Sequence, residues 1–328
     1  MRCAAAFAEA AMSFAAPAID DAPVAGTLEP GIPLSLEAPL THAVVGLGRF
    51  GSVHARKLAG LPGFHLRAMV DRSPAVRPGT ELAALRLLSS VDDLPPDIQS
   101  ATIATSDETH ADVALALMHR GCHVLVEKPL CVNQFDGALM VRTALRCGVT
   151  LSTGHIERFN PALHDGVLRW LRQAAADHRH QAQPFLRFRR YSSRHAMARD
   201  SVLDLMVHDI DLFAWSCAIP ADAPLEVITR RIGARSVHAR VRLGGLIADL
   251  ESGYDDMPTT AQLQVCIAGG PRVIDLRGGA RRIVAAGDDA LARQYRDFRR
   301  AIHGQASRIA SGVDGLVAVQ RACQVLHA

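Results

Sequence analysis

A glycine-rich turn between an apolar strand and a helix constrains the fold of this chain more than any other feature. The apolar residues 43–45 run into the sequence GLGRFG at positions 46–51, and a helical pattern begins at Ser52. In such a turn the first glycine permits tight bending, the second lets a diphosphate approach the backbone, and the third lets the helix pack on the strand. The N–H groups at the helix start would face the phosphates. The predicted cofactor contacts in this turn are Gly46, Gly48, Arg49, Phe50 and Gly51.

An acidic residue in the expected place favours a dinucleotide site over an ordinary glycine turn. A second apolar strand, Leu66–Val70, ends at Asp71, about twenty positions beyond Gly51. A carboxylate there accepts hydrogen bonds from the adenosine ribose and repels a 2′-phosphate, so it favours NAD over NADP. Arg72, the next residue, would soften this preference, and we expect both side chains to contact the cofactor.

The size and charge of the chain restrict what kind of protein it is. Its 328 residues are enough for two domains, each with its own hydrophobic core. The net charge of +3 is too small, and the arginines are too scattered, to indicate a nucleic-acid partner. No apolar run is long enough to cross a bilayer, so we expect no membrane partner.

Cysteine usage and the N-terminal composition bear on the location of the protein. Seven cysteines without a C-x-x-C pair argue against a disulfide framework and a structural zinc. We therefore expect reduced thiols, no metal site and a cytoplasmic location. Residues 1–40 are rich in alanine and proline and lack periodicity, which predicts an irregular arm. A signal peptide is the alternative, but Glu9 interrupts its apolar part.

Alternating strand and helix patterns predict an α/β fold with a doubly wound parallel sheet of the Rossmann type in the first half of the chain. The predicted strands are His42–Val45, Leu66–Val70, Ala101–Ala104, Val124–Val126 and Thr150–Ser152. Helical patterns cover Ser52–Ala59, Ala111–His119 and Gln134–Arg146. Ligands gather at the carboxyl ends of the strands in such a sheet. The residues that lie there, and that we expect to contact the cofactor, are Thr105, Ser106, Glu127 and Lys128.

The second half of the chain has a different pattern. Beyond residue 184, period-two alternation with glycine-bearing turns predicts an α+β region with a large, mainly antiparallel sheet. The predicted strands are Phe185–Tyr191, Leu225–Ile232, Ser236–Leu243, Leu246–Tyr254, Ala261–Ile267, Arg272–Leu276 and Arg281–Ala285. Helical patterns cover residues 161–176, 201–217, 290–302 and 313–326.

Three ionisable residues that share one helical stripe interrupt the mainly apolar segment Ser201–Cys217. Asp204, His208 and Asp211 recur at spacings of four and three residues, which places them on one stripe of an α-helix. Buried ionisable groups are costly unless they are paired. Two interpretations follow: a structural Asp204–His208 pair, or a general base, His208, that Asp204 orients in a cleft.

Lys128 favours the catalytic interpretation. A buried strand delivers Glu127-Lys128-Pro129 to the sheet edge where the cofactor is expected. Of the 36 basic Lys and Arg side chains in the sequence, only Lys57 and Lys128 are lysines. Lysine, unlike arginine, can release a proton near neutral pH when it is partly desolvated. A lysine that reaches into solvent at a strand end remains the alternative.

The order of these motifs resembles a known family. G-x-G-x-x-G, Ala104-Thr105-Ser106 with His110, Glu127-Lys128-Pro129 and Asp204-x-x-x-His208 follow one another between about residues 41 and 219. This order is similar to that of the Gfo/Idh/MocA family of NAD(P)-dependent oxidoreductases, which includes glucose–fructose oxidoreductase and inositol dehydrogenases. One departure is Ser106, because many members carry proline in that turn.

The resemblance implies a division of the chain and roles for its residues. It implies an arm over residues 1–40, a dinucleotide-binding domain over 41–156, and a domain over 157–328 for substrate binding and for homodimer or homotetramer formation. It places His110 at the cofactor. It also implies that Lys128 and His208 flank the reacting carbinol, while Asp204 contacts the substrate hydroxyls.

A narrower resemblance lies in the sequence HIERFNP at positions 155–161, which is similar to the branch that acts on nucleotide-linked N-acetylhexosamines. It implies that Arg158 and Asn160 contact the substrate. A helix N-terminus with Pro161 in its first turn is the alternative for Asn160. The basic strand Phe185–Arg190, with Arg194 and Arg199 after it, suits either a nucleotide diphosphate or a solvated sheet face.

The expected function is therefore that of an NAD-dependent sugar dehydrogenase. It would transfer hydride from a ring carbinol, expected at C3 of a UDP-N-acetylhexosamine such as UDP-N-acetylglucosamine, to nicotinamide. Two alternatives remain open at this point. One is a dehydrogenase of a free polyol such as an inositol, and the other is a regulator that binds NAD without catalysis.

Overall fold

The computed structural model describes residues 38–73, 75, 79, 82–193, 200–255, 258–268, 270–277 and 288–328. Several predictions lie outside this part of the chain. They concern residues 1–37 of the predicted arm, the predicted strand at 281–285, and the arginines at positions 194 and 199.

The first sheet has the strand order β13-β6-β5-β4-β1-β2-β3. Its strands are β1 (Leu40–Val45), β2 (Phe64–Val70), β3 (Arg86–Leu88), β4 (Ser100–Ile103), β5 (His123–Val126), β6 (Leu151–Thr153) and β13 (Ala310–Ser311). All neighbours pair in parallel except β13, which is antiparallel to β6. The order 3-2-1-4-5-6 of the first six strands is that of the doubly wound dinucleotide-binding fold, which confirms the predicted Rossmann class.

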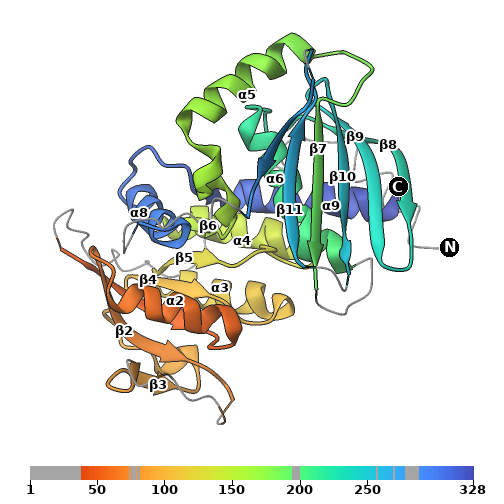
Figure 1. Cartoon of the computed structure of the whole chain (residues 1–328). Helices are drawn as coiled ribbons and strands as arrows, with labels where there is room; N and C mark the ends of the chain where they lie inside the picture. The colour runs from red at the N-terminus through yellow and green to blue at the C-terminus, as the bar shows by residue number, and fades with distance from the viewer. Residues whose placement is uncertain are drawn as a thin grey trace. The chain divides into compact units, whose positions relative to one another are not determined.

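Helices cover this sheet (Figure 1). They are α2 (Arg49–Ala59), α3 (His110–His119), α4 (Gln134–Cys147), α8 (Ala290–Ile302) and α9 (Gly312–His327). The first three follow strands of the sheet directly. Helices α8 and α9 come from the end of the chain, where α8 contacts α2 and α9 contacts α4 and β6. Residues far apart in the sequence therefore complete the first sheet and its covering layers.

The second sheet has the order β12-β11-β7-β10-β9-β8. Its strands are β7 (Leu186–Ser192), β8 (Leu225–Ile232), β9 (Ser236–Leu243), β10 (Leu246–Tyr254), β11 (Thr260–Val265) and β12 (Arg272–Asp275). Only the β7–β10 pair is parallel within the described residues, so the sheet is mainly antiparallel, as predicted. Helix α5 (Asp165–His178) precedes this sheet in the chain.

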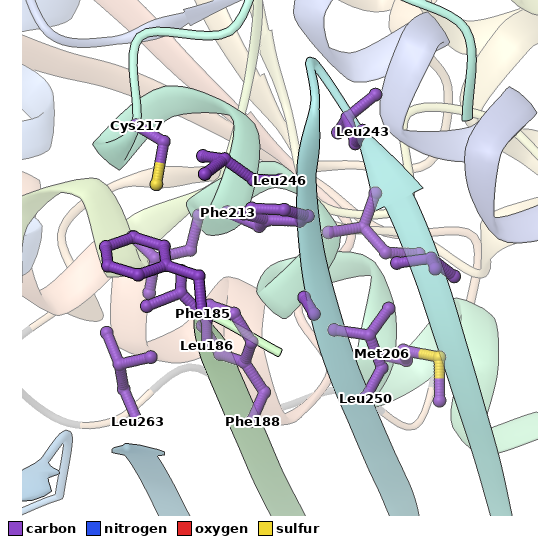
Figure 2. Close-up of a cluster of buried hydrophobic side chains, with 14 of the residues drawn as sticks. Phe185, Leu186, Phe188, Met206, Phe213, Cys217, Leu243, Leu246, Leu250 and Leu263 are labelled. Carbon is purple, nitrogen blue, oxygen red and sulfur yellow. The ribbon is translucent and has the colours of Figure 1, made fainter. Parts of the chain in front are cut away.

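One face of the second sheet packs on helices through a large apolar cluster (Figure 2). Phe185 and Phe188 come from or adjoin β7, and Phe213 comes from α6 (Val207–Ser216). The side chains of these three residues are each about 1% exposed. Alternate residues along β9 are buried, which is the period-two pattern of a strand with one covered face.

The predicted boundaries are most accurate where the periodicity is strongest. The predicted bounds of β8, β9, β10 and α8 agree with the structure at both ends. Strands β3 and β13 have no counterpart in the prediction. They are three and two residues long, so neither contains enough alternation to be distinguished from a loop.

The packing of α6 on the second sheet leads to a stability prediction. Phe213→Ala should lower the free energy of unfolding by about 3–5 kcal/mol, because it removes a buried ring and leaves a cavity. Urea denaturation followed by circular dichroism measures this change. Phe135→Ala is the matched control, because that ring is 75% exposed. Equal losses in the two variants would contradict this account of the core.

Candidate active site

The glycine-rich turn has the geometry that a diphosphate requires. Gly46 has a φ of +86°, and a Cβ atom there would lie 2.6 Å from the Ala104 carbonyl oxygen. A Cβ atom on Gly51 would lie 1.7 Å from the Gly46 carbonyl oxygen, so the helix packs directly on the turn. Nothing lies within 4 Å of the same position on Gly48, which leaves its backbone accessible. The geometry confirms the tight turn at Gly46 and the close helix packing at Gly51, and the approach of a diphosphate to Gly48 remains a prediction.

A cavity of about 520 Å³ opens beside this turn at the carboxyl ends of β1, β2 and β4. Asp71 is half-buried in its wall, and its carboxylate accepts hydrogen bonds from the backbone N–H groups of Leu47, at 2.7 Å, and Ser73, at 2.8 Å. This carboxylate therefore has a fixed orientation. The predicted cofactor contacts that line the cavity are Gly46, Gly48, Arg49, Phe50, Asp71, Arg72, Thr105 and Ser106.

Other residues also line this cavity but were not predicted. They are Ser89, Ser90 and Val91, which follow β3, together with Thr109, Asp112 and Val113 near the start of α3. One signal could have identified Ser89, Ser90 and Val91, namely their place after a parallel strand. Strand β3, however, is too short to be recognised from the sequence. The open glycine backbone, the oriented acid and the cavity together fit a dinucleotide.

Four predicted cofactor residues do not line this cavity: Gly51, His110, Glu127 and Lys128. The His110 ring is buried, and its Nδ1 lies 2.9 Å from the Pro129 carbonyl oxygen, so it holds the segment that follows Lys128. The Glu127 carboxylate lies 3.0 Å from Nε2 of His54. Contact between these residues and the cofactor remains a prediction.

An ion pair joins Lys128, after β5, to Asp204 in η6 (Val202–Met206). Lys128 Nζ donates to Asp204 Oδ1 at 2.8 Å and to its carbonyl oxygen at 3.0 Å. The hydroxyl of Tyr254, at the end of β10, donates to Asp204 Oδ2 at 3.0 Å. The two side chains of the ion pair are only 12% and 23% exposed, so solvent screens it little. Two residues that the sequence analysis singled out are thus in direct contact.

The structure corrects the predicted Asp204–His208 pair. Residues 202–206 form a π-helical turn, and the α-helix begins only at Val207. A π turn is wider than an α turn, so the predicted α-helical stripe is not maintained. Among the described residues, Asp204 is hydrogen-bonded to Lys128 and Tyr254 rather than to His208.

His208 has an environment that keeps its imidazole neutral. The side chain is half-buried, and Nδ1 is enclosed without a hydrogen-bond partner among the residues that the structure describes. The ring of His155 packs edge-on against it, with centroids 6.0 Å apart. Burial, together with the positive charges of Lys128 and Arg190 and the neighbouring His155, lowers the pKa of His208 well below its usual value. A neutral imidazole beside the Lys128 ammonium is available to accept a proton.

Arg158 and Asn160 form contacts within the protein. Arg158 donates two hydrogen bonds to Asp211, at 2.9 and 2.5 Å, and a longer one to Asp314 at 3.4 Å. Asn160 accepts from the Ala162 N–H, which caps the short helix Pro161–Leu163 as the alternative interpretation expected. Contact of either residue with substrate remains a prediction.

The basic strand β7 divides its arginines between two environments. Arg187 and Arg189 are exposed and lie near Asp249 and Glu251 on the open sheet face. Arg190 is buried and donates to Asp209 and Glu157, with 2.7 Å to each at closest approach. The exposed pair fits the solvated-face alternative, whereas the third arginine belongs to a buried network.

The first part of the chain matches the model of a known protein family. Residues 40–155 match GFO_IDH_MocA, an oxidoreductase family with an NAD-binding Rossmann fold. This stretch thus matches the family that the sequence motifs resemble, and the NAD-binding fold of that family agrees with the predicted cofactor. In the part of the chain that the structure describes, no helix is both long enough and apolar enough to span a membrane.

The chain is similar to particular members of this class. It is 29% identical over 214 residues to UDP-N-acetylglucosamine 3-dehydrogenase of Acidithiobacillus ferrooxidans, covering 64% of this chain and 63% of that one. It is 28% identical to myo-inositol 2-dehydrogenase of Thermotoga maritima, covering 52% of each. The chain thus matches less than two thirds of the length of these relatives.

Solved structures extend the likeness to both sheets. The structure of UDP-N-acetylglucosamine 3-dehydrogenase GnnA from Acidithiobacillus ferrooxidans has a TM-score of 0.71 and 26% identity, covering 88% of this chain and 97% of that one. GenD2 from gentamicin A biosynthesis, solved in complex with NAD, has a TM-score of 0.72. Its 21% identity, with 92% and 97% of the two chains covered, shows a shared fold.

The position of Asp71 predicts the cofactor preference. Asp71→Asn should weaken NAD binding about tenfold and reduce the discrimination against NADP, because it removes the charge that binds ribose and repels a 2′-phosphate. Calorimetric titration with each dinucleotide measures both effects without a sugar substrate. Asp249→Asn, on the open face of the second sheet, is the control and should leave both affinities unchanged. An unaltered ratio of the two affinities in Asp71→Asn would exclude this role.

The lowered pKa of His208 predicts a dependence of stability on pH. The unfolded chain protonates this histidine near its usual pKa of 6.5, whereas the folded protein resists protonation. The free energy of unfolding should therefore fall as the pH decreases below about 6.5, by at most about 1.4 kcal/mol per pH unit from this residue. In urea titrations between pH 7 and 4.5, His208→Asn should show a shallower fall than the wild type. Parallel curves would contradict the proposed burial of a neutral imidazole.

Proposed function

We propose that the chain is an NAD-dependent sugar dehydrogenase that oxidises a ring carbinol. The observation that carries this proposal is the Lys128–Asp204 ion pair. It joins the end of β5, on the edge of the sheet that carries the dinucleotide cavity, to the helix that carries His208. The same pocket would therefore hold an ammonium, a carboxylate and a neutral imidazole around the reacting carbon.

Each of these three groups has a chemical role in the proposal. The Lys128 ammonium, anchored by Asp204, donates a hydrogen bond to the carbinol oxygen and stabilises the negative charge that develops there. His208, held neutral, accepts the hydroxyl proton. The Asp204 carboxylate accepts a hydrogen bond from a neighbouring sugar hydroxyl. NAD, when bound, supplies the hydride acceptor.

The proposed substrate is a UDP-N-acetylhexosamine such as UDP-N-acetylglucosamine, oxidised at C3. Two observations support it: the 29% identity to a UDP-N-acetylglucosamine 3-dehydrogenase and the 26% identity to GnnA over both sheets. The myo-inositol relative, at 28% identity, supports a free polyol as the second candidate.

Residues 157–328 are proposed as the region for substrate binding and for homodimer or homotetramer formation. Free thiols at the six described cysteines are consistent with the proposed cytoplasmic location.

A substrate panel tests the proposal. Purified full-length protein is incubated with NAD and either UDP-N-acetylglucosamine, myo-inositol or scyllo-inositol, and NADH is followed by absorbance. We expect turnover with the nucleotide sugar. Turnover with an inositol but not with the nucleotide sugar would make a free polyol the substrate in place of UDP-N-acetylglucosamine. Binding of NAD without oxidation of any sugar would favour a regulator that binds the dinucleotide without catalysis.

The two lysines of the chain provide a matched pair of variants. Lys128→Met should lower kcat by at least about a hundredfold, because it removes the donor to the carbinol oxygen. Lys57→Met removes the other lysine, which pairs with Asp289 on a half-exposed surface, and should retain nearly full kcat. NADH production at saturating substrate measures both. Comparable activity in Lys128→Met and the wild type would remove Lys128 from the mechanism.

A further inference from the structure

A line of buried polar side chains leads away from Glu127, the residue before Lys128. His54 on α2 lies between Glu127 and Tyr295, with Nε2 3.0 Å from Glu127 Oε1 and Nδ1 2.7 Å from the Tyr295 hydroxyl. That hydroxyl lies 2.8 Å from Thr102 Oγ1 on β4, which lies 2.9 Å from Nε2 of His42 on β1. The line ends with Ser100, whose Oγ lies 2.7 Å from Nδ1 of His42.

The direction of these hydrogen bonds follows from the number of protons available. A carboxylate only accepts, so Nε2 of His54 carries the hydrogen that Glu127 receives. With Nδ1 then free to accept, the Tyr295 hydroxyl donates to it, and the tyrosine oxygen accepts from Thr102. Burial and the nearby His54 lower the pKa of His42 to about 3, so its ring is neutral and carries one N–H. That N–H donates to Thr102, and Ser100 donates to the other ring nitrogen.

This arrangement gives every member of the line a partner although all but Glu127 are nearly fully buried. The exposed fractions of His42, Ser100, Thr102 and Tyr295 are each 0%, and that of His54 is 3%. A buried polar network is stable only when its members are satisfied, and one missing donor would leave several groups unpaired. The line also joins distant parts of the chain, because Tyr295 comes from α8 near the C-terminus whereas the other members lie between His42 and Glu127.

We propose that His54 and Tyr295 are positioning residues that hold the Glu127 carboxylate ionised and fixed beside Lys128. This inference rests on the proposed function, because it assigns the line a task in the same site. The carboxylate has little room to move, since a Cβ atom on Gly154 would lie 2.7 Å from Glu127 Oε1. A fixed negative charge next to Lys128 attracts its ammonium group and so helps to orient the donor to the carbinol oxygen.

The charged and titratable groups around Glu127 agree with this role. His54 faces it from α2, Tyr295 from α8, His155 from the segment after β6, and Lys128 is its chain neighbour. Burial acts to raise the pKa of the Glu127 carboxyl, but the hydrogen bond from His54 and the charge of Lys128 lower it overall. Removal of the donor should therefore raise this pKa.

Substitutions in the line test the proposal by two readouts. Tyr295→Phe removes the donor that places the His54 hydrogen on Nε2, so the Glu127 carboxyl should titrate at higher pH. Carbon-13 NMR of protein labelled at glutamate measures this titration, and Glu127→Gln identifies the signal. The acid limb of the pH profile of kcat/KM should move in the same direction, and kcat/KM at pH 7 should fall about tenfold.

Three further variants separate positioning from packing. Phe298→Leu alters a fully buried ring one turn away on α8, so it should lower stability without moving either titration. His54→Gln keeps an N–H donor near the position of Nε2 and should stay close to wild type, whereas His54→Leu should shift the titration as Tyr295→Phe does.

The outcomes distinguish this inference from the proposed function. A Glu127 titration that is the same in Tyr295→Phe, Phe298→Leu and wild type overturns the positioning role. A shifted titration in an enzyme that oxidises none of the tested sugars supports the line as the holder of Glu127 but refutes the proposed activity. Equal loss in His54→Gln and His54→Leu would also overturn the inference, because the donor alone should suffice.

Discussion

The contact between the Lys128 ammonium and the Asp204 carboxylate is the interaction on which the candidate site depends. The two residues are 76 positions apart in the chain and lie at the edge of one sheet and beside the other. A half-buried ion pair of this kind strongly disfavours removal of either partner, because the remaining charge would lack compensation. The pair therefore fixes the helix that carries His208 against the edge of the sheet that carries the dinucleotide cavity.

The surroundings of this pair contain many buried charges, and their partners explain how the fold tolerates them. Arg190 lies between Asp209 and Glu157, and Arg158 lies against Asp211. Each guanidinium forms several hydrogen bonds to carboxylates, which offsets the cost of desolvation. Asp209 and Asp211, which accept these hydrogen bonds, both lie on the helix that carries His208. The networks restrict the position of this helix, and buried ring nitrogens of His155 and His208 have no hydrogen-bond partner within the described residues.

Much of the fold could be predicted because its elements carry strong local signals. The alternation in residues 236–254 and the glycine-rich turn at 46–51 each depend on residues that are neighbours in sequence. The same reasoning failed for the segment 202–206, because an α-helix and a π turn are compatible with the same apolar composition. The choice between them depends on contacts with Lys128 and Tyr254, which a local pattern does not contain.

The sequence by itself determined the Rossmann class, and it carried the resemblance to a family and the prediction of an NAD preference from Asp71, since these depend on short motifs and their order. Only the tertiary structure decided which side chains meet. It paired Asp204 with Lys128 instead of His208, engaged Arg158 with Asp211, and brought Tyr295 to His54. The physical reason is that burial and hydrogen-bond partners are set by segments distant in the chain, which compete for each polar group only after the fold has formed.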